Sequence, residues 1–168
     1  MSYTRSLDLG CGPNPKNPFN ANELYGIDVR NLGPNIVAAD LVIEPIPFES
    51  AMFDFVTAHD FLEHVPRLLY APQRRNCFVE LMNEIWRVLK LGGQFFSVTP
   101  AYPHAPAFRD PTHVNFITEE TFPFYFDDKH RWAHMYGFTG AFEIIEQQWN
   151  GPHLLSLLRK VEAPQPLI

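Results

Sequence analysis

Cysteine is scarce in this chain, which has only Cys11 and Cys77 among its 168 residues. Two cysteines are too few for the disulfide framework that stabilises many small secreted domains. Cys11 also lies between Gly10 and Gly12, in a turn where a bridge would obstruct access. We therefore expect two free thiols and a cytoplasmic protein.

Long apolar runs are missing as well. No stretch approaches the roughly 20 apolar residues that a membrane-spanning helix needs. The amino terminus does not begin with a basic region followed by an apolar run, as a secretory signal would. These observations predict a soluble, unexported protein that does not act at a membrane.

Basic residues are fewer than acidic ones, with 13 Lys and Arg against 19 Asp and Glu, for a net charge of -6. Nucleic-acid-coating surfaces need clustered Lys and Arg to contact phosphates, so a nucleic-acid partner is disfavoured. A small basic patch can still hide within a negative total. The charge suits a cationic ligand at least as well as an anionic one.

Apolar residues, by contrast, make up 46% of the chain and include 15 Phe, enough for a substantial core. We expect one domain spanning residues 1–168, with a frayed tail at 163–168 where Pro164 and Pro166 stand among polar and small residues. Runs rich in Ile, Val, Leu and Phe predict strands at 5–9, 24–28, 36–39, 53–58, 94–99, 141–148 and 153–161.

One amphipathic helix is predicted between the fourth and fifth strands. Apolar side chains recur at helical spacing from Phe78 to Leu89, Lys90 suits the last turn, and Gly92-Gly93 ends the helix. Strands mixed with such a helix favour an α/β sheet with its ligand crevice at the carboxyl ends of the strands. Asn150-Gly151 is a hairpin signal, so the final strand should run antiparallel.

A glycine turn, Gly10-Cys11-Gly12, follows the first strand, and Asp28 ends the second. Glycine permits positive φ and close approach of a ligand, while a carboxylate at that place can accept hydrogen bonds from ribose hydroxyls. The same residues also suit a purely structural turn with a solvated loop carboxylate. Prolines in residues 13–18 disfavour the long helix that would bind a pyrophosphate. An adenosine-containing ligand without a pyrophosphate would not need that helix.

Four further segments follow the glycine turn in a definite order. They are Ala39-Asp40-Leu41, Phe53-Asp54-Phe55-Val56, His59-Asp60-Phe61-Leu62-Glu63-His64-Val65 and Glu84-Ile85-Trp86-Arg87-Val88-Leu89-Lys90-Leu91-Gly92-Gly93. With the turn they closely resemble a class I S-adenosylmethionine-dependent methyltransferase of the type carrying "Leu-Glu-His" and "Arg-Val-Leu-Lys-x-Gly-Gly" signatures. The resemblance covers about residues 5–125. It implies a Rossmann-like α/β fold whose seven-stranded mixed sheet has the order 3-2-1-4-5-7-6, with the last strand antiparallel.

The resemblance also implies S-adenosyl-L-methionine as cofactor and assigns its binding residues by position. Asp8, Gly10, Cys11 and Gly12 match the motif around the methionine portion, and Asp28 matches the acid that binds the ribose. Asp40 matches the acceptor of the adenine amino group, Leu41 presents its backbone N–H to the ring, and His59 and Asp60 line the sulfonium and the acceptor.

The chain departs from that family at its amino terminus, where it lacks the helices that usually cover the cofactor. Three arrangements could replace that cover. Residues 100–117 could close over the site as a flap, a second subunit of a homodimer could cover it, or the cofactor could be held loosely.

The segment 100–117 is the expected acceptor loop, since irregular connections of this length are usually functional or disordered. Its Asp-Pro-x-His turn resembles bacterial members that modify glycans or other small acceptors. His113, oriented by Asp110, would suit a hydroxyl acceptor as its base. The bland alternative for His113 is a loop imidazole that bonds a neighbouring backbone group. Thr118 is expected to cap the helix that follows.

His64 is a third candidate catalytic residue, with a packed imidazole beside a helix-start acid as its structural alternative. His130 and His134 could share a helix face, but one pair lacks the third and fourth ligands that zinc normally takes. We therefore expect no metal.

The favoured interpretation is methyl transfer to a small-molecule or glycan acceptor by in-line displacement. Two rivals stay open: a degenerate methyltransferase fold that binds without turnover, and a nicotinamide-dependent oxidoreductase. The oxidoreductase is disfavoured because the turn lacks a third glycine and is followed by prolines.

Overall fold

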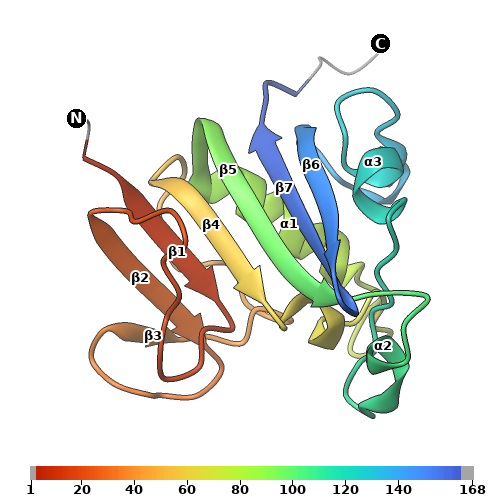
Figure 1. The fold of residues 1–168 in the computed structure, drawn as a ribbon, viewed down its shortest axis with the longest axis horizontal. Coiled ribbons are helices and arrows are strands. Elements are labelled where there is room, and N and C mark those ends of the chain that lie inside the picture. The colour runs from red at the N-terminus through yellow and green to blue at the C-terminus, as the bar shows by residue number, and fades with distance from the viewer. Residues whose placement is uncertain (1–2, 164–168) are drawn as a thin grey trace.

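Seven strands form one mixed sheet in the computed structural model, which describes residues 3–163 (Figure 1). The strands are Arg5–Leu9 (β1), Glu23–Asp28 (β2), Ile36–Ala38 (β3), Phe53–His59 (β4), Leu89–Pro100 (β5), Phe142–Asn150 (β6) and His153–Lys160 (β7). Their order is β3-β2-β1-β4-β5-β7-β6, and β7 runs antiparallel to both of its neighbours. The predicted order and the antiparallel last strand are confirmed.

Strand β1, the middle one of the five parallel strands, is buried on both faces, as such a strand usually is. Leu7 and Leu9 belong to the main hydrophobic core, and Ser6 and Asp8 are buried as well. Both neighbours, β2 and β4, pair with β1 in parallel. The glycine turn that follows Leu9 therefore emerges at the middle of the sheet's carboxyl edge.

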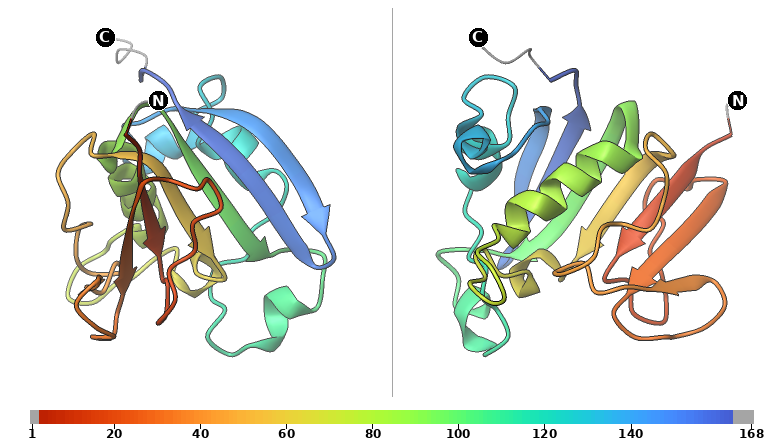
Figure 2. Two further views of the ribbon diagram at one scale, coloured as in Figure 1. Left: turned by 60° about the vertical axis from the view of Figure 1, so that its left-hand side comes forward. Right: turned by 180° about the vertical axis from the view of Figure 1, so that it is seen from behind.

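The long helix α1, Cys77–Val88, lies across one face of the sheet (Figure 2). Its predicted apolar stripe is confirmed, because Phe78, Leu81, Met82, Ile85 and Val88 are all buried. The helix ends at Val88, two residues before Lys90, which was predicted to lie in its last turn. Leu89 already has extended backbone and starts β5, where it pairs with Phe53.

The placement of Lys90 in the helix was therefore wrong. Lys90 lies on β5, and its Nζ is 2.8 and 2.9 Å from the two carboxylate oxygens of Asp54. Strand pairing of Leu89 and this ion pair outweigh the weak preference for a basic residue at a helix end. Gly92, at φ +78°, lies between Leu89 and Gln94, where the pairing register of β5 with β4 shifts.

No helix forms between β1 and β2 in the described residues, as the prolines predicted. The intervening coil instead packs on the sheet face opposite α1 (Figure 1). The Phe19 ring stacks on Phe55 of β4 with centroids 4.3 Å apart, and it meets Phe96 of β5 edge-on. A coil segment thus shields part of that face.

The hairpin between β6 and β7 is confirmed, with Asn150 paired to His153 and Gly151 at φ +58°. Because β7 is antiparallel, its first residue lies at the edge where the parallel strands end. This places His153 beside Pro100, the last residue of β5.

The chain between β5 and β6 carries short helices, Pro106–Arg109 (α2), Thr121–Tyr125 (α3) and the 3-10 turn Trp132–Tyr136 (η2). Phe122 of α3 packs edge-on against Phe95, on the same face as α1. The expected cap at Thr118 is wrong, because α3 starts at Thr121 with Glu120 at its N-cap. Thr118 Oγ1 instead accepts from the Glu120 N–H and stabilises the turn before the helix.

None of the helices formed by residues 3–163 is long and apolar enough to cross a bilayer. The predicted frayed tail, 163–168, lies outside the described residues except for Ala163.

Candidate functional site

A cavity of about 430 Å³ opens at the carboxyl ends of β1, β2 and β4. Of the residues predicted to bind a cofactor, it is lined by Gly10, Asp28, Asp40, Leu41 and Asp60. His64, predicted to be catalytic, lines it too. The topology thus brings together residues that are spread over more than fifty positions in the sequence.

The two positions Gly10 and Gly12 of the turn suit glycine for different physical reasons. Both have positive φ, +62° at Gly10 and +58° at Gly12. A Cβ on Gly10 would come within 2.4 Å of the Phe61 ring, so that glycine makes room for a neighbouring side chain. A Cβ on Gly12 would meet nothing within 4 Å, which leaves open space beside the backbone there.

Asp28 ties the turn to β2. Its buried carboxylate accepts the Gly12 N–H at 3.0 Å, and it also accepts from the Arg30 backbone N–H and guanidinium. The Arg30 hydrogen bonds hold the pKa of Asp28 below its usual value. Since the Arg30 side chain is 63% exposed, it can leave the carboxylate when a ligand with two hydroxyls arrives.

Asp8 does not line the cavity. The contact with the methionine portion that the resemblance implies for Asp8 stays a prediction. Asp8 is 1% exposed, and its oxygens accept from Thr57 Oγ1 at 2.6 Å and from the Lys16 backbone N–H at 2.8 Å. Asp8 therefore anchors the coil after the glycine turn. His59 lies behind it, with Nδ1 at 3.5 Å from Asp8 Oδ1.

Cys11 is likewise turned away from the cavity. A Cβ on Gly26 of β2 would lie 2.7 Å from its Sγ, so the thiol packs closely against that strand. Burial, together with the negative charges of Asp8 and Asp28, raises the pKa of Cys11 to about 11. A thiol that stays protonated at neutral pH is a poor nucleophile, and its role here is packing.

Asp40 and Leu41 follow β3 at the outer end of the cavity. Asp40 Oδ1 accepts the Val42 N–H at 3.0 Å, which closes a tight turn. Leu41 is buried beneath that turn. Both residues are therefore held in position without a ligand.

One pair at this edge was missed by the sequence reasoning. His153 Nε2 lies 3.0 Å from Asp60 Oδ1, although the two residues are 93 positions apart. Asp60 has the strained backbone angle φ +49°, a conformation that costs energy for a non-glycine residue and clusters at functional sites. The antiparallel direction of β7 was the signal that could have placed His153 at this edge.

The predicted catalytic residues His64, Asp110 and His113 come together, but not in the predicted arrangement. His113 Nε2 is 3.9 Å from Asp110 Oδ2, beyond hydrogen-bond distance, and its Nδ1 lies 3.1 Å from the Pro106 carbonyl. Asp110 instead accepts from Thr112, whose hydroxyl lies 3.0 Å from His64 Nδ1. The two imidazole rings meet edge-on, with centroids 4.8 Å apart.

Segment 112–116 is fastened to the 3-10 turn Leu62–His64 (η1). The Val114 and Asn115 N–H groups both donate to the Glu63 carbonyl, and the Asn115 amide donates to the Leu62 carbonyl. Arg67 Nε donates to Asn115 Oδ1 at 2.7 Å. The carboxyl half of the predicted flap is thus held by several hydrogen bonds.

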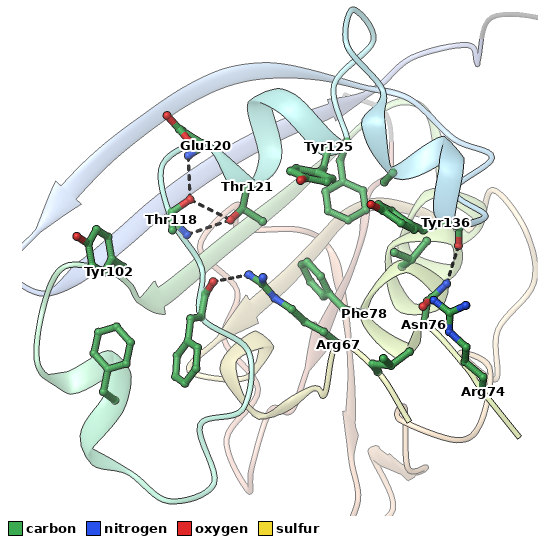
Figure 3. A pocket seen from close by; sticks show the side chains of 16 residues that line it. Arg67, Arg74, Asn76, Phe78, Tyr102, Thr118, Glu120, Thr121, Tyr125 and Tyr136 are labelled. Atoms are coloured by element: carbon green, nitrogen blue, oxygen red, sulfur yellow. Dashed lines mark hydrogen bonds between the residues drawn. The ribbon is translucent and has the colours of Figure 1, made fainter. Parts of the chain in front are cut away.

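A second cavity, of about 600 Å³, lies on the α1 side and shares no lining residue with the first (Figure 3). Seven of its 16 lining residues are aromatic, and three of these, Tyr102, Phe108 and Phe116, come from segment 100–117. Arg67 lines this cavity and donates to the Phe116 carbonyl, which is an uncharged acceptor (Figure 3). Sequence reasoning had no signal for this cavity beyond the aromatic residues of the loop.

The histidine pair His130 and His134 does not share a helix. His130 precedes η2 and its Nδ1 lies 2.8 Å from Asp127 Oδ2, while His134 Nδ1 lies 3.2 Å from the Phe138 carbonyl.

Comparison with known proteins adds a family and a fold. A family model described as "Methyltransferase domain" matches residues 7–97, and no curated protein matches the chain. Similar solved structures include one from Bacillus halodurans (16% identity, TM-score 0.63, 96% of this chain and 94% of that one). A SAM-dependent methyltransferase of Aquifex aeolicus matches with 15% identity, TM-score 0.60 and coverage of 96% and 84%. The cyclase SpnF also matches, with 17% identity, TM-score 0.62 and coverage of 95% and 75%.

Proposed function

This chain belongs to the methyltransferase domain family, and from that premise we propose that it transfers the methyl group of S-adenosylmethionine to a hydroxyl of a small molecule or glycan. The observation that carries the proposal is the cavity at the carboxyl edge, which is lined by Gly10 and by Asp28, whose carboxylate is buried. The bound cofactor would supply a sulfonium, whose sulfur carries the methyl group and leaves as the neutral thioether when the methyl is transferred.

The residues present fit an adenosine better than a dinucleotide. The cavity of about 430 Å³ falls in the range of small-molecule sites. Asp28 would bind the two ribose hydroxyls, Asp40 would accept from the adenine amino group, and Leu41 would offer its N–H. Dinucleotide sites place a pyrophosphate on a helix that follows the glycine turn, and residues 10–22 form no helix here.

A hydroxyl acceptor has to lose its proton, and we assign that step to His153. Its Nε2 is held by Asp60, which lines the cofactor cavity. A carboxylate that orients an imidazole is the arrangement expected of a general base. With Asp60 on Nε2, His153 Nδ1 is the atom left to take the proton.

Positioning is the other contribution of the chain, because transfer needs the acceptor oxygen in line with the methyl and water excluded. We assign acceptor binding to segment 100–117, whose Tyr102, Phe108 and Phe116 are exposed. Tyr102 and Phe108 meet edge-on at 6.3 Å, and Phe108 lies 4.8 Å from Phe116. Neighbouring aromatic rings offer the broad apolar faces that ring-shaped acceptors stack on.

His64, Asp110 and His113 stay proposed catalytic residues, in the sense that they would contact the acceptor at the rim. Covering of the cofactor by segment 100–117, or by a second copy of the chain, also stays a proposal. The fastening of residues 112–116 to η1 supports a pre-ordered wall over a freely swinging flap.

The proposal is tested by titration calorimetry with S-adenosylhomocysteine, the demethylated product, and with NAD. We expect binding of the first and none of the second. Incubation with S-adenosylmethionine and panels of hydroxylated small molecules and glycans should then release S-adenosylhomocysteine only when an acceptor is present. No binding at millimolar ligand would overturn the proposal, and binding without turnover on any acceptor would favour a non-catalytic module.

A further inference from the structure

Three potential metal ligands meet at the rim of the cofactor cavity, and we propose that Glu63, His64 and His113 bind a divalent transition metal ion of the zinc type. One carboxylate oxygen and one nitrogen from each imidazole lie within 4.8 Å of one another. His113 is 49 positions from His64, so their spacing in the sequence predicts no such cluster. The hydrogen bonds between segment 112–116 and η1 bring them together.

The hydrogen bonds of both imidazoles leave one nitrogen free for a metal. His113 Nδ1 faces the Pro106 carbonyl, which can only accept, so Nδ1 carries the proton and Nε2 keeps its lone pair. Thr112 donates its hydroxyl hydrogen bond to Asp110, so its oxygen accepts the hydrogen bond from His64 Nδ1–H. A metal-ligating histidine almost always donates its second N–H in this way, to a carbonyl or through a polar group to a carboxylate.

The third ligand is a buried carboxylate with one oxygen left over. Glu63 is 1% exposed, and its Oε2 accepts from Thr99 Oγ1 at 2.6 Å. Its Oε1 is buried and has no hydrogen-bond partner among residues 3–163. An unpartnered buried oxygen is costly in a folded protein, and a bound cation would satisfy it.

The geometry is close to what a metal needs. Bonds of about 2.0–2.1 Å in a tetrahedral site place ligand atoms roughly 3.3 Å apart. Since the present atoms lie within 4.8 Å, each pair has to approach by no more than about 1.5 Å. His64 is exposed and can turn into position, whereas Glu63 and the backbone of 113–115 are already fixed.

Two imidazoles and one carboxylate favour zinc, iron or a related transition metal over magnesium and calcium, which prefer all-oxygen sites. Three protein ligands would leave the fourth position open, as in catalytic zinc sites. His64 also lines the cofactor cavity, so the open position would face the acceptor region. This last step rests on the proposed methyl transfer: an acceptor hydroxyl bound there would ionise more readily.

The test is zinc binding to the tag-free full chain, measured by competition with a chromophoric chelator. We expect one zinc per chain, and at least 100-fold weaker binding in each of His64→Ala, His113→Ala and Glu63→Gln. The matched control is the double variant His130→Ala/His134→Ala, which removes two imidazoles elsewhere and should leave zinc affinity unchanged. X-ray absorption of the zinc-loaded protein should report two imidazole ligands and at least one oxygen.

Absence of zinc binding by the wild-type chain would overturn the metal site, and so would affinity that survives His113→Ala but falls in the control. Thermal melting and S-adenosylhomocysteine binding of each variant show whether it is folded. If the alanine variants do not fold, Glu63→Gln still tests the site, because its amide oxygen can accept the hydrogen bond from Thr99. A wild-type chain that binds zinc but not S-adenosylhomocysteine would instead contradict the proposed function. The two proposals therefore fail separately.

Discussion

Replacing Asp28 by alanine is the sharpest test of where the cofactor lies. In the free protein this carboxylate accepts from Gly12 and from Arg30, and both Asp28 and Arg30 line the cavity. With a cofactor bound, we expect the exposed Arg30 guanidinium to leave and two ribose hydroxyls to replace it. Asp28→Ala removes the acceptor of both hydroxyls.

The magnitude follows from the number of hydrogen bonds that are lost. A hydrogen bond to a charged group contributes about 1.5–3 kcal/mol, so two contribute about 3 kcal/mol at the low end. Each 1.4 kcal/mol is a factor of about ten in affinity, and Asp28→Ala should therefore weaken S-adenosylhomocysteine binding roughly 100-fold. Arg30→Ala should leave the affinity unchanged or make it tighter, because it removes a competitor for the same carboxylate.

Titration calorimetry measures the effect, with Glu23→Ala as the matched control. Glu23 is an acid at the start of the same strand, and it pairs with Arg5 outside the cavity. Because Asp28 also holds the Gly12 turn, thermal melting without ligand has to show that the variant is folded. A folded Asp28→Ala protein whose affinity is within threefold of the wild type would refute the ribose placement.

Three further predictions follow from single contacts. Gly140→Ala should lower the free energy of unfolding by about 1–3 kcal/mol in a denaturant titration, because a Cβ there would lie 2.6 Å from the Trp86 ring; an unchanged midpoint would contradict this packing. Arg30→Ala should raise the pKa of Asp28 in a carboxyl NMR titration, since Arg30 is the main cause of its lowered value. Ionised Asp28 stabilises the fold at pH values above the ordinary carboxyl pKa, and this contribution is lost as the pH falls through the lower pKa that Asp28 has in the folded protein. Because Arg30→Ala brings the folded pKa closer to the ordinary one, the contribution of Asp28 to stability should be smaller in the variant. His153→Ala should lower kcat about 100-fold or more on a hydroxyl acceptor while leaving S-adenosylhomocysteine affinity unchanged, and an unaltered kcat would exclude His153 as the base.

Local patterns were enough for most of the fold. Runs rich in Ile, Val, Leu and Phe located the strands, helical spacing located α1, and Asn150-Gly151 located the hairpin. The ordered motifs named the family, and the match over residues 7–97 confirms it. Element ends were less predictable: Lys90 lies near the start of a strand, where it forms an ion pair with Asp54, and not at the end of the helix.

The sequence by itself determined the residues whose roles depend on near neighbours: the glycine turn, the carboxylate that ends β2, and the prolines that exclude a helix after the turn. Only the tertiary structure decided which of these face the cavity. Asp8 and Cys11 turn away from the cavity because the coil and β2 pack against them, whereas Asp28 lines it. The pair Asp60–His153 and the group Glu63, His64 and His113 depend on contacts between distant segments, set by strand direction and loop docking, which residue spacing along the chain does not encode.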